Sequence, residues 1–172
     1  ALFENETLTK EQIEQYLMEY YGAEQVLWLG DGIVGDDTDG HIDDITRFVN
    51  HNTVLTVVES NPLDENFVLL HENLETLKSL RLPNGEALNI ITLPMPSPVI
   101  HEDTRLPASY ANYYIANHAI IVPTFRDVND ALALEIIQSA YPDRKVVGID
   151  STDIIWGLGS FHCLSQQEPA LS

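Results

Sequence analysis

The residues best suited to chemistry gather in one short stretch, positions 35–44. It reads Gly-Asp-Asp-Thr-Asp-Gly-His-Ile-Asp-Asp and so holds five carboxylates and one imidazole. Carboxylates this close repel one another, so folding gains little from such a loop unless a cation lies among them. A solvated acidic turn before a strand would have the same composition. Spacing alone leaves both interpretations open.

The histidine of this stretch has a defined relation to the acid two positions later. If Ile42 is buried in an extended segment, His41 and Asp43 point to the same side of the chain. Gly40, directly before the histidine, lets the backbone turn tightly or approach a ligand. We therefore expect His41 and Asp43 to lie together.

No metal site follows from the acidic pattern. Placing Gly40 at the invariant sixth position of an EF-hand loop puts Gly35 first and Thr46 twelfth, where a carboxylate is required. Zinc is no better supported, because the chain has one cysteine and no His-Glu-x-x-His helix. We predict neither a metal nor a cofactor.

The only cysteine, Cys163, lies near the end of the chain, after Gly157, Gly159 and His162. The glycines allow close backbone approach just before it. A lone cysteine is more often a small buried hydrophobe than a nucleophile. In an extended segment the side chain of His162 would point to the opposite face, so His41 is the better candidate for a base acting on Cys163.

Composition limits the class of partner. The 172 residues include 27 acids against 8 Lys and Arg, which gives a net charge of −19 and a pI near 4.3. Nucleic acids and anionic membranes require clustered cations, so we exclude both and favour small cationic ligands. No apolar run approaches the about 20 residues of a membrane span, and no signal peptide is visible. One cysteine suits a reducing compartment, so we expect a cytoplasmic protein; the start at Ala1 leaves a lost N-terminus open.

Periodicity predicts the elements that position these residues. Thr9 and Gln12 form a capping box for a helix over 10–21, and a short buried strand follows at 26–29. The acidic stretch then lies at the carboxyl end of a strand, where ligands tend to bind in α/β sheets. The later elements are a hairpin of strands 45–49 and 53–58, a helix carrying Phe67, Leu70, Leu74, Leu77 and Leu80, a strand at 88–93, a proline-rich loop at 94–109, a hairpin of strands 110–116 and 119–122, a helix at 128–141 and a strand at 146–150.

The order of hairpin, helix, strand and loop occurs twice, over 45–109 and over 110–163. A repeated ββαβ unit with polar terminal loops suggests modules arranged around a shared centre, with a plain two-layer α/β domain as the alternative. In the repeated arrangement the loops that carry His41, Asp43 and Cys163 occupy equivalent places, so these side chains can meet.

Residues 35–44, together with Gly159-Ser-Phe-His-Cys and the later Gln-Gln-Glu-Pro, closely resemble the motifs of the agmatine deiminase family. Bacterial peptidylarginine deiminases and the wider guanidine-modifying superfamily are related to it. The resemblance covers nearly the whole chain and implies a five-bladed α/β propeller of the pentein type. Residues 1–172 would form one catalytic domain, the C-terminal half of such a propeller. The family's N-terminal motifs, which supply two further carboxylates to the guanidinium, have no counterpart here.

The resemblance also implies roles for individual residues. Cys163 would be the nucleophile and His41 the general acid and base, while Asp43 would bind the guanidinium nitrogens. The expected substrate pocket includes Asp37, Asp39 and Gly159. The expected reaction converts agmatine to N-carbamoylputrescine and ammonia, a step of putrescine biosynthesis and polyamine metabolism, without metal or cofactor.

Three questions remain open at this level. Peptidylarginine is the alternative substrate, because both enzymes share the same core residues. An inactive fragment or binding module is the alternative from another class, since half a propeller leaves sheet edges and the carboxylate cage incomplete. Association into a homo-oligomer is also open. His101 and Trp156 are further candidates for the pocket wall.

Overall fold

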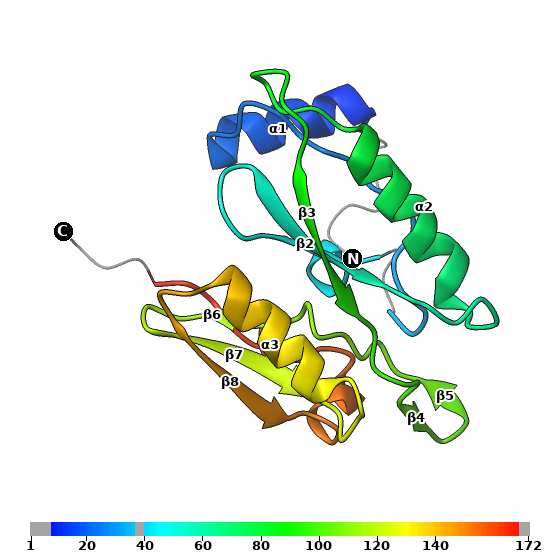
Figure 1. The fold of residues 1–172 in the computed structure, drawn as a ribbon. Helices are drawn as coiled ribbons and strands as arrows, with labels where there is room; N and C mark the ends of the chain where they lie inside the picture. The colour runs from blue at the N-terminus through cyan, green and yellow to red at the C-terminus, as the bar shows by residue number, and fades with distance from the viewer. Residues whose placement is uncertain (1–7, 37–39, 169–172) are drawn as a thin grey trace.

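The computed structural model describes residues 8–36 and 40–168, and its elements follow the predicted order (Figure 1). The first helix, α1, spans Lys10–Tyr21. Two short 3₁₀ helices, η1 and η2, lie beside the site described below. The elements after α1 are η1 (Ile42–Asp44), β1 (Thr46–Phe48), β2 (Thr53–Val58), α2 (Asn66–Ser79), β3 (Asn89–Pro94), β4 (Ile100–His101), β5 (Thr104–Arg105), β6 (Tyr114–Ile115), β7 (Ala119–Thr124), α3 (Asp130–Ala140), β8 (Lys145–Asp150) and η2 (Ile154–Gly157).

The repeated ββαβ unit is confirmed. In the first module β1 pairs antiparallel with β2, and β2 pairs parallel with β3. In the second module β6 pairs antiparallel with β7, and β7 pairs parallel with β8. A helix connects the parallel strands each time, because parallel neighbours need a long crossover. The chain is therefore a mixed α/β protein with two modules of the same topology, and the closed propeller stays a prediction.

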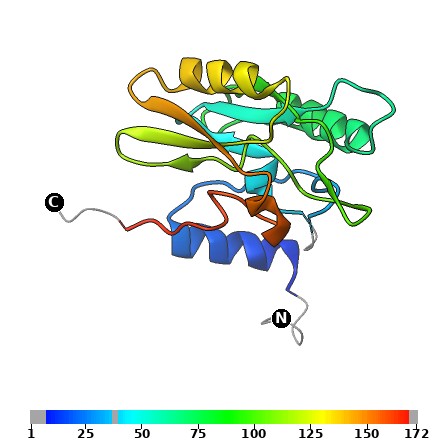
Figure 2. The ribbon, with the colours of Figure 1, turned by 90° about the horizontal axis from the view of Figure 1, so that it is seen from below.

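Both modules contribute to one buried apolar cluster, which places their sheets side by side. The fully buried members of this cluster include Leu55, Val57 and Leu70 from the first module and Ile120, Val122 and Ile137 from the second. Helices α2 and α3 lie on one side of the strands (Figure 2). Helix α1 and the segment that follows η2 lie on the other side.

Helix α1 forms as its end signals predict, but its apolar side is only partly covered: Ile13 and Leu17 are half-buried. The Thr9 hydroxyl accepts a hydrogen bond from the Gln12 amide, Gln12 Oε1 accepts one from the Thr9 amide, and Gly22 ends the helix in a left-handed conformation. No residue of α1 is buried, and Tyr20 is 78% exposed. Within residues 8–36 and 40–168, no helix combines the length and apolarity of a membrane span.

The predicted strand at 26–29 is wrong. Among the described residues this segment pairs with no strand. The indole of Trp28 donates to Glu14 Oε1 of α1 at 2.6 Å. Leu27 and Leu29 nevertheless pack against buried apolar residues. The apolar pattern therefore predicted correctly that these side chains pack against the core. It could not predict strand pairing, which also requires a neighbouring strand.

The proline-rich loop predicted at 94–109 has secondary structure of its own. It contains a small antiparallel hairpin of β4 and β5. Glu102 and Asp103 form its turn with φ of 48° and 64°. A two-residue turn with positive φ at both positions usually calls for Gly or Asn. The absence of either residue hid this turn from sequence analysis.

Candidate active site

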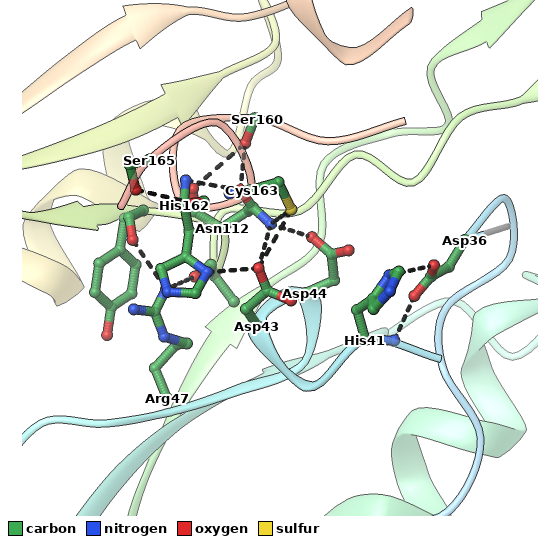
Figure 3. Close-up of polar contacts among 12 residues, drawn as sticks. Asp36, His41, Asp43, Asp44, Arg47, Asn112, Ser160, His162, Cys163 and Ser165 are labelled. Carbon is green, nitrogen blue, oxygen red and sulfur yellow. Dashed lines mark hydrogen bonds and ion pairs between the residues drawn. The ribbon is translucent and has the colours of Figure 1, made fainter. Parts of the chain in front are cut away.

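The candidate site lies at the seam between the two modules. Asp43 and Asp44 belong to η1, directly before β1 of the first module. Asn112 lies just before β6 of the second module, and Cys163 follows η2. Side chains from three distant parts of the chain therefore converge here (Figure 3).

Hydrogen bonds across the seam fix the first module against the second. Arg47 on β1 donates to the carbonyl oxygens of Ala111 (3.0 Å) and Tyr113 (2.9 Å), and its guanidinium lies 4.7 Å from the centre of the Tyr113 ring. The hydroxyl of Ser109 donates to the carbonyl oxygen of Asp44 at 2.7 Å. These contacts hold η1 against the segment that carries Asn112.

Helix α2 anchors the backbone that leads into the acidic stretch. Its inward face carries two buried asparagines besides its leucines. Asn73 accepts a hydrogen bond from the Gly30 amide (2.7 Å) and donates to the Asp31 carbonyl (3.0 Å), while Asn66 accepts one from the Val34 amide (2.8 Å). Buried backbone groups need such partners in the absence of a ladder. The segment at 30–34 is thus held without being a strand.

Asp43 and Cys163, two of the predicted catalytic residues, lie together. The thiol of Cys163 is 3.3 Å from Asp43 Oδ2. The same oxygen lies 2.6 Å from Nδ1 of His162. The carboxylate of Asp43 therefore contacts both the sulfur and an imidazole.

Asn112 organises the centre of the cluster. Its side-chain nitrogen lies near three acceptors: Asp43 Oδ2 (3.1 Å), Asp44 Oδ1 (2.8 Å) and Cys163 Sγ (2.9 Å). Its side-chain oxygen accepts from three donors: Ser160 Oγ (3.0 Å), the His162 amide (3.0 Å) and the Cys163 amide (3.3 Å). The amide nitrogen carries two protons, so its three acceptors share them. One buried side chain thereby positions the nucleophile and both carboxylates.

The backbone turns tightly at Cys163, and this corrects the extended conformation expected there. The Leu164 amide donates to the Ser160 carbonyl and the Ser165 amide to the His162 carbonyl, each at 3.0 Å. In this turn His162 reaches Asp43 on the same side as the thiol, not the opposite face. Gly159 lies under the thiol: a Cβ at this position would be 2.6 Å from the Cβ of Cys163. A glycine is therefore required for the turn to close.

The residues around Cys163 favour the protonated thiol. Burial, together with the nearby charges of Asp43 and Asp44, raises the pKa of Cys163 to about 11, although the amide of Asn112 acts in the opposite direction. Negative charge beside a thiol disfavours the thiolate. A bound cation would have the opposite effect.

The two neighbouring aspartates titrate differently. Burial tends to raise the pKa of Asp43, but the hydrogen bonds from His162 and Cys163 outweigh it and lower this pKa. Asp44 is 1% exposed, and burial followed by the charge of Asp43 raises its pKa to about 7. Near neutral pH, Asp43 is therefore charged while Asp44 holds a proton for part of the time.

His41 does not lie as the extended-segment argument predicted. Residues 42–44 form a 3₁₀ turn, and Ile42 is 55% exposed, so His41 and Asp43 are not placed on one side by strand alternation. Nδ1 of His41 lies 2.7 Å from Oδ1 of Asp36, and its amide donates to Oδ2 of the same residue. The imidazole is directed toward Asp36 (Figure 3).

Asp44 connects the two parts of the site. Donor atoms of Asp43, Asp44 and Cys163 lie within 4.8 Å of one another, and so do those of Asp36, His41 and Asp44. Within the part of the chain that the structure describes, these are the groups compact enough to share a metal ion. Carboxylate clusters of this kind occur without metal, so we assign none. The shared Asp44 places His41 and Cys163 on either side of one carboxyl group.

Other predicted residues have less defined places. Asp37 and Asp39 lie outside the described residues. His101 of the β4–β5 hairpin stacks on Trp156 of η2, with ring centres 3.6 Å apart. The proline-rich loop therefore contacts the segment that leads to Cys163.

Sequence reasoning missed three residues of the site. Asp44 belongs to the acidic stretch and His162 is next to the cysteine, so each had a local signal that was assigned elsewhere. Asn112 had none, because its importance depends on partners more than 50 positions away. Only a folded arrangement identifies such a residue.

The sequence matches the Porphyromonas-type peptidyl-arginine deiminase family over residues 3–169. A Legionella pneumophila (strain Paris) protein, provisionally assigned as an agmatine deiminase, is 38% identical over 166 residues, which are 96% of this chain and 48% of that protein.

Solved structures give the same relationship. A Porphyromonas gingivalis protein, provisionally assigned as an arginine deiminase, has a TM-score of 0.91 at 41% identity, covering 98% of this chain and 51% of that one. The C. jejuni agmatine deiminase with substrate bound has a TM-score of 0.84 at 36% identity, covering 94% and 47%. The chain thus spans about half the length of these relatives.

Proposed function

Because the chain belongs to the Porphyromonas-type peptidyl-arginine deiminase family, we propose that it carries the nucleophile of a hydrolase that deiminates a guanidinium compound. The products are a ureido compound and ammonia. Agmatine is the proposed substrate and N-carbamoylputrescine the proposed product.

The observation that carries this proposal is the meeting of Asp43 and Cys163. The two residues are 120 positions apart, and the Asp43 carboxylate lies within hydrogen-bond distance of the thiol. A carboxylate beside a sulfur suits a flat cation, because the carboxylate can hold the N–H groups while the sulfur faces the carbon. The resemblance assigns guanidinium binding to Asp43 and nucleophilic attack to Cys163, and these two roles require adjacent side chains.

The first step joins sulfur to carbon. A guanidinium carbon is a poor electrophile, so the attacking group is the thiolate. Binding of the cation beside Cys163 offsets the field of Asp43 and Asp44 and lowers the pKa of the thiol. The thiol proton passes to His41, the C–S bond forms, and the carbon becomes tetrahedral.

The second step breaks a C–N bond, and the third restores the enzyme. His41 returns its proton to the departing nitrogen, which leaves as ammonia and gives an amidino-thioether. A water molecule then attacks the carbon and loses a proton to His41. Collapse breaks the C–S bond and forms the ureido C=O, while the hydroxyl proton leaves to solvent. The sulfur regains a proton from His41, so the thiol and the neutral imidazole are restored. We expect the His41 ring to turn from Asp36 toward the substrate for these transfers.

Two features favour agmatine over peptidylarginine. The chain carries a net charge of −19, which favours a small substrate with a cation at each end. The C. jejuni relative that binds its substrate is an agmatine deiminase. The matched family is named for peptidyl-arginine deiminases, so arginine within a peptide chain is the second candidate substrate.

The remaining carboxylates of the guanidinium site belong, on this proposal, to the half of the relatives that this chain does not span. The isolated 172-residue chain is then expected to release little ammonia. If the isolated chain instead releases ammonia rapidly from agmatine, the proposal that its guanidinium site is incomplete is wrong.

The test is turnover by the protein with all of its flanking sequence. Ammonia and ureido product are measured with agmatine and, separately, with a peptide containing internal arginine. We expect ammonia from agmatine, and none from the Cys163→Ala variant, which should still bind agmatine. Citrulline formation in the peptide alone would select the second candidate. No ammonia from either would contradict deimination.

A further inference from the structure

His162 makes a contact that its position next to the nucleophile does not predict. Its Nδ1 lies 2.6 Å from Asp43 Oδ2, and the side chains are 30% and 15% exposed. Its backbone amide donates to Asn112 Oδ1 at 3.0 Å. The backbone of His162 is therefore held by Asn112, and its ring is directed at Asp43 (Figure 3).

Three groups share one oxygen of Asp43. The thiol of Cys163, the amide nitrogen of Asn112 and the ring nitrogen of His162 all lie within hydrogen-bond distance of Oδ2. Their convergence on Oδ2 restrains the rotation of the carboxylate. The contact with His162 is the shortest of the three. A carboxylate that must grip a planar cation gains from such support, because orientation fixed in advance is not lost on binding.

We infer that His162 is a positioning residue: its Nδ1–H donates to Asp43 Oδ2 and holds the carboxylate in the orientation that binds the guanidinium. The donated N–H also partly offsets the negative charge of Asp43, the carboxylate that faces the thiol. This inference rests on the proposed function for its effect on catalysis. Its effect on Asp43 and Cys163 is independent of any substrate.

The hydrogen bond made by the ring of His162 is with Asp43 and not with the nucleophile. The imidazole nitrogen that faces the site contacts Asp43, and Asp43 in turn contacts the sulfur. His162 therefore acts through Asp43.

The test compares three variants in the protein with its flanking sequence. His162→Ala removes the donor, and His162→Asn keeps a side-chain N–H close to the position of Nδ1. His118→Ala, in the exposed turn between β6 and β7, is the matched control. We expect His162→Ala to raise KM for agmatine about tenfold and to lower kcat/KM by more, with His162→Asn recovering most of the loss. The backbone bond to Asn112 is available in all three variants.

A second readout uses the 172-residue chain without substrate. The rate of Cys163 alkylation by iodoacetamide is followed against pH. Loss of the donor leaves the Asp43 charge unshielded, so the His162→Ala profile is expected to move to higher pH, whereas His162→Asn and His118→Ala keep the wild-type profile. An unmoved profile for His162→Ala overturns the inference even if wild-type deiminates agmatine. Absence of turnover in wild type, with a moved profile, would instead count against the proposed function alone.

Discussion

Oδ2 of Asp43 lies 3.3 Å from Sγ of Cys163, so the group that would bind the substrate cation also touches the nucleophile. Burial and the charge of Asp43 both work against the thiolate, and the pKa of Cys163 is raised to about 11. On the proposed function, substrate binding and thiol ionisation are coupled through this carboxylate. We expect the coupling to keep Cys163 weakly reactive toward other electrophiles until a guanidinium binds.

Asp43→Asn is expected to make the thiol more reactive while it weakens deimination. Removal of the carboxylate charge favours the thiolate, so iodoacetamide should modify Cys163 roughly tenfold faster at pH 8 than in wild type. The substrate loses its charge-assisted partner at the same time, so kcat/KM should fall. Mass spectrometry of the alkylated chain provides the rate, with the exposed Asp143→Asn as control. Slower alkylation would contradict the coupling.

Gly159→Ala is expected to displace Cys163. The added Cβ would lie 2.6 Å from the Cβ of Cys163, closer than side chains approach, so the turn must shift. Turnover should fall at least about a hundredfold, because the sulfur leaves its position over the substrate carbon. Gly157→Ala is the matched variant, since nothing lies within 4 Å of a Cβ there. Steady-state kinetics on both variants give the comparison, and similar activities would show that the close contact is not required.

Asp44→Asn should change the pH dependence of stability. The pKa of Asp44 is raised from 3.8 to about 7, so the folded chain holds a proton that the unfolded chain has lost. This contribution is complete below pH 3.8 and is lost as the pH rises through 7. Relative to wild type, the variant should therefore gain stability between pH 4 and pH 8, by at most roughly 4 kcal/mol.

Urea unfolding of both proteins across this pH range measures the difference in free energy. Subtracting the two curves removes the contribution of the other acids, because those groups are common to both. A difference that stays constant with pH would show that Asp44 is charged throughout.

The repeated ββαβ units were predictable because their signals are local. Apolar residues recur at helical spacing through Leu70 and Leu77, and β-branched runs form β2 and β7. The segment at 26–29 carried an equally good local pattern but forms no ladder. Strand pairing depends on a neighbour, and apolar character by itself reports only burial.

The candidate site was predictable in part. The acidic stretch and the cysteine were identified from composition and motif, and Asp43 does lie against Cys163. Their connection through Asn112 was not predictable, because an isolated asparagine before a strand carries no pattern. The predicted orientations of His41 and His162 were wrong for one shared reason. Both were argued from extended backbone, whereas tight turns place each side chain.

The central claim is that Cys163 forms a bond to the carbon of a guanidinium. The most direct measurement is mass spectrometry of the protein with its flanking sequence, quenched in acid during turnover of agmatine and digested with a protease. We predict an amidino adduct on the peptide that contains Cys163, which disappears when agmatine is exhausted and never forms in Cys163→Ala. N-carbamoylputrescine production by Cys163→Ala, or turnover with the adduct on another residue, would contradict the account.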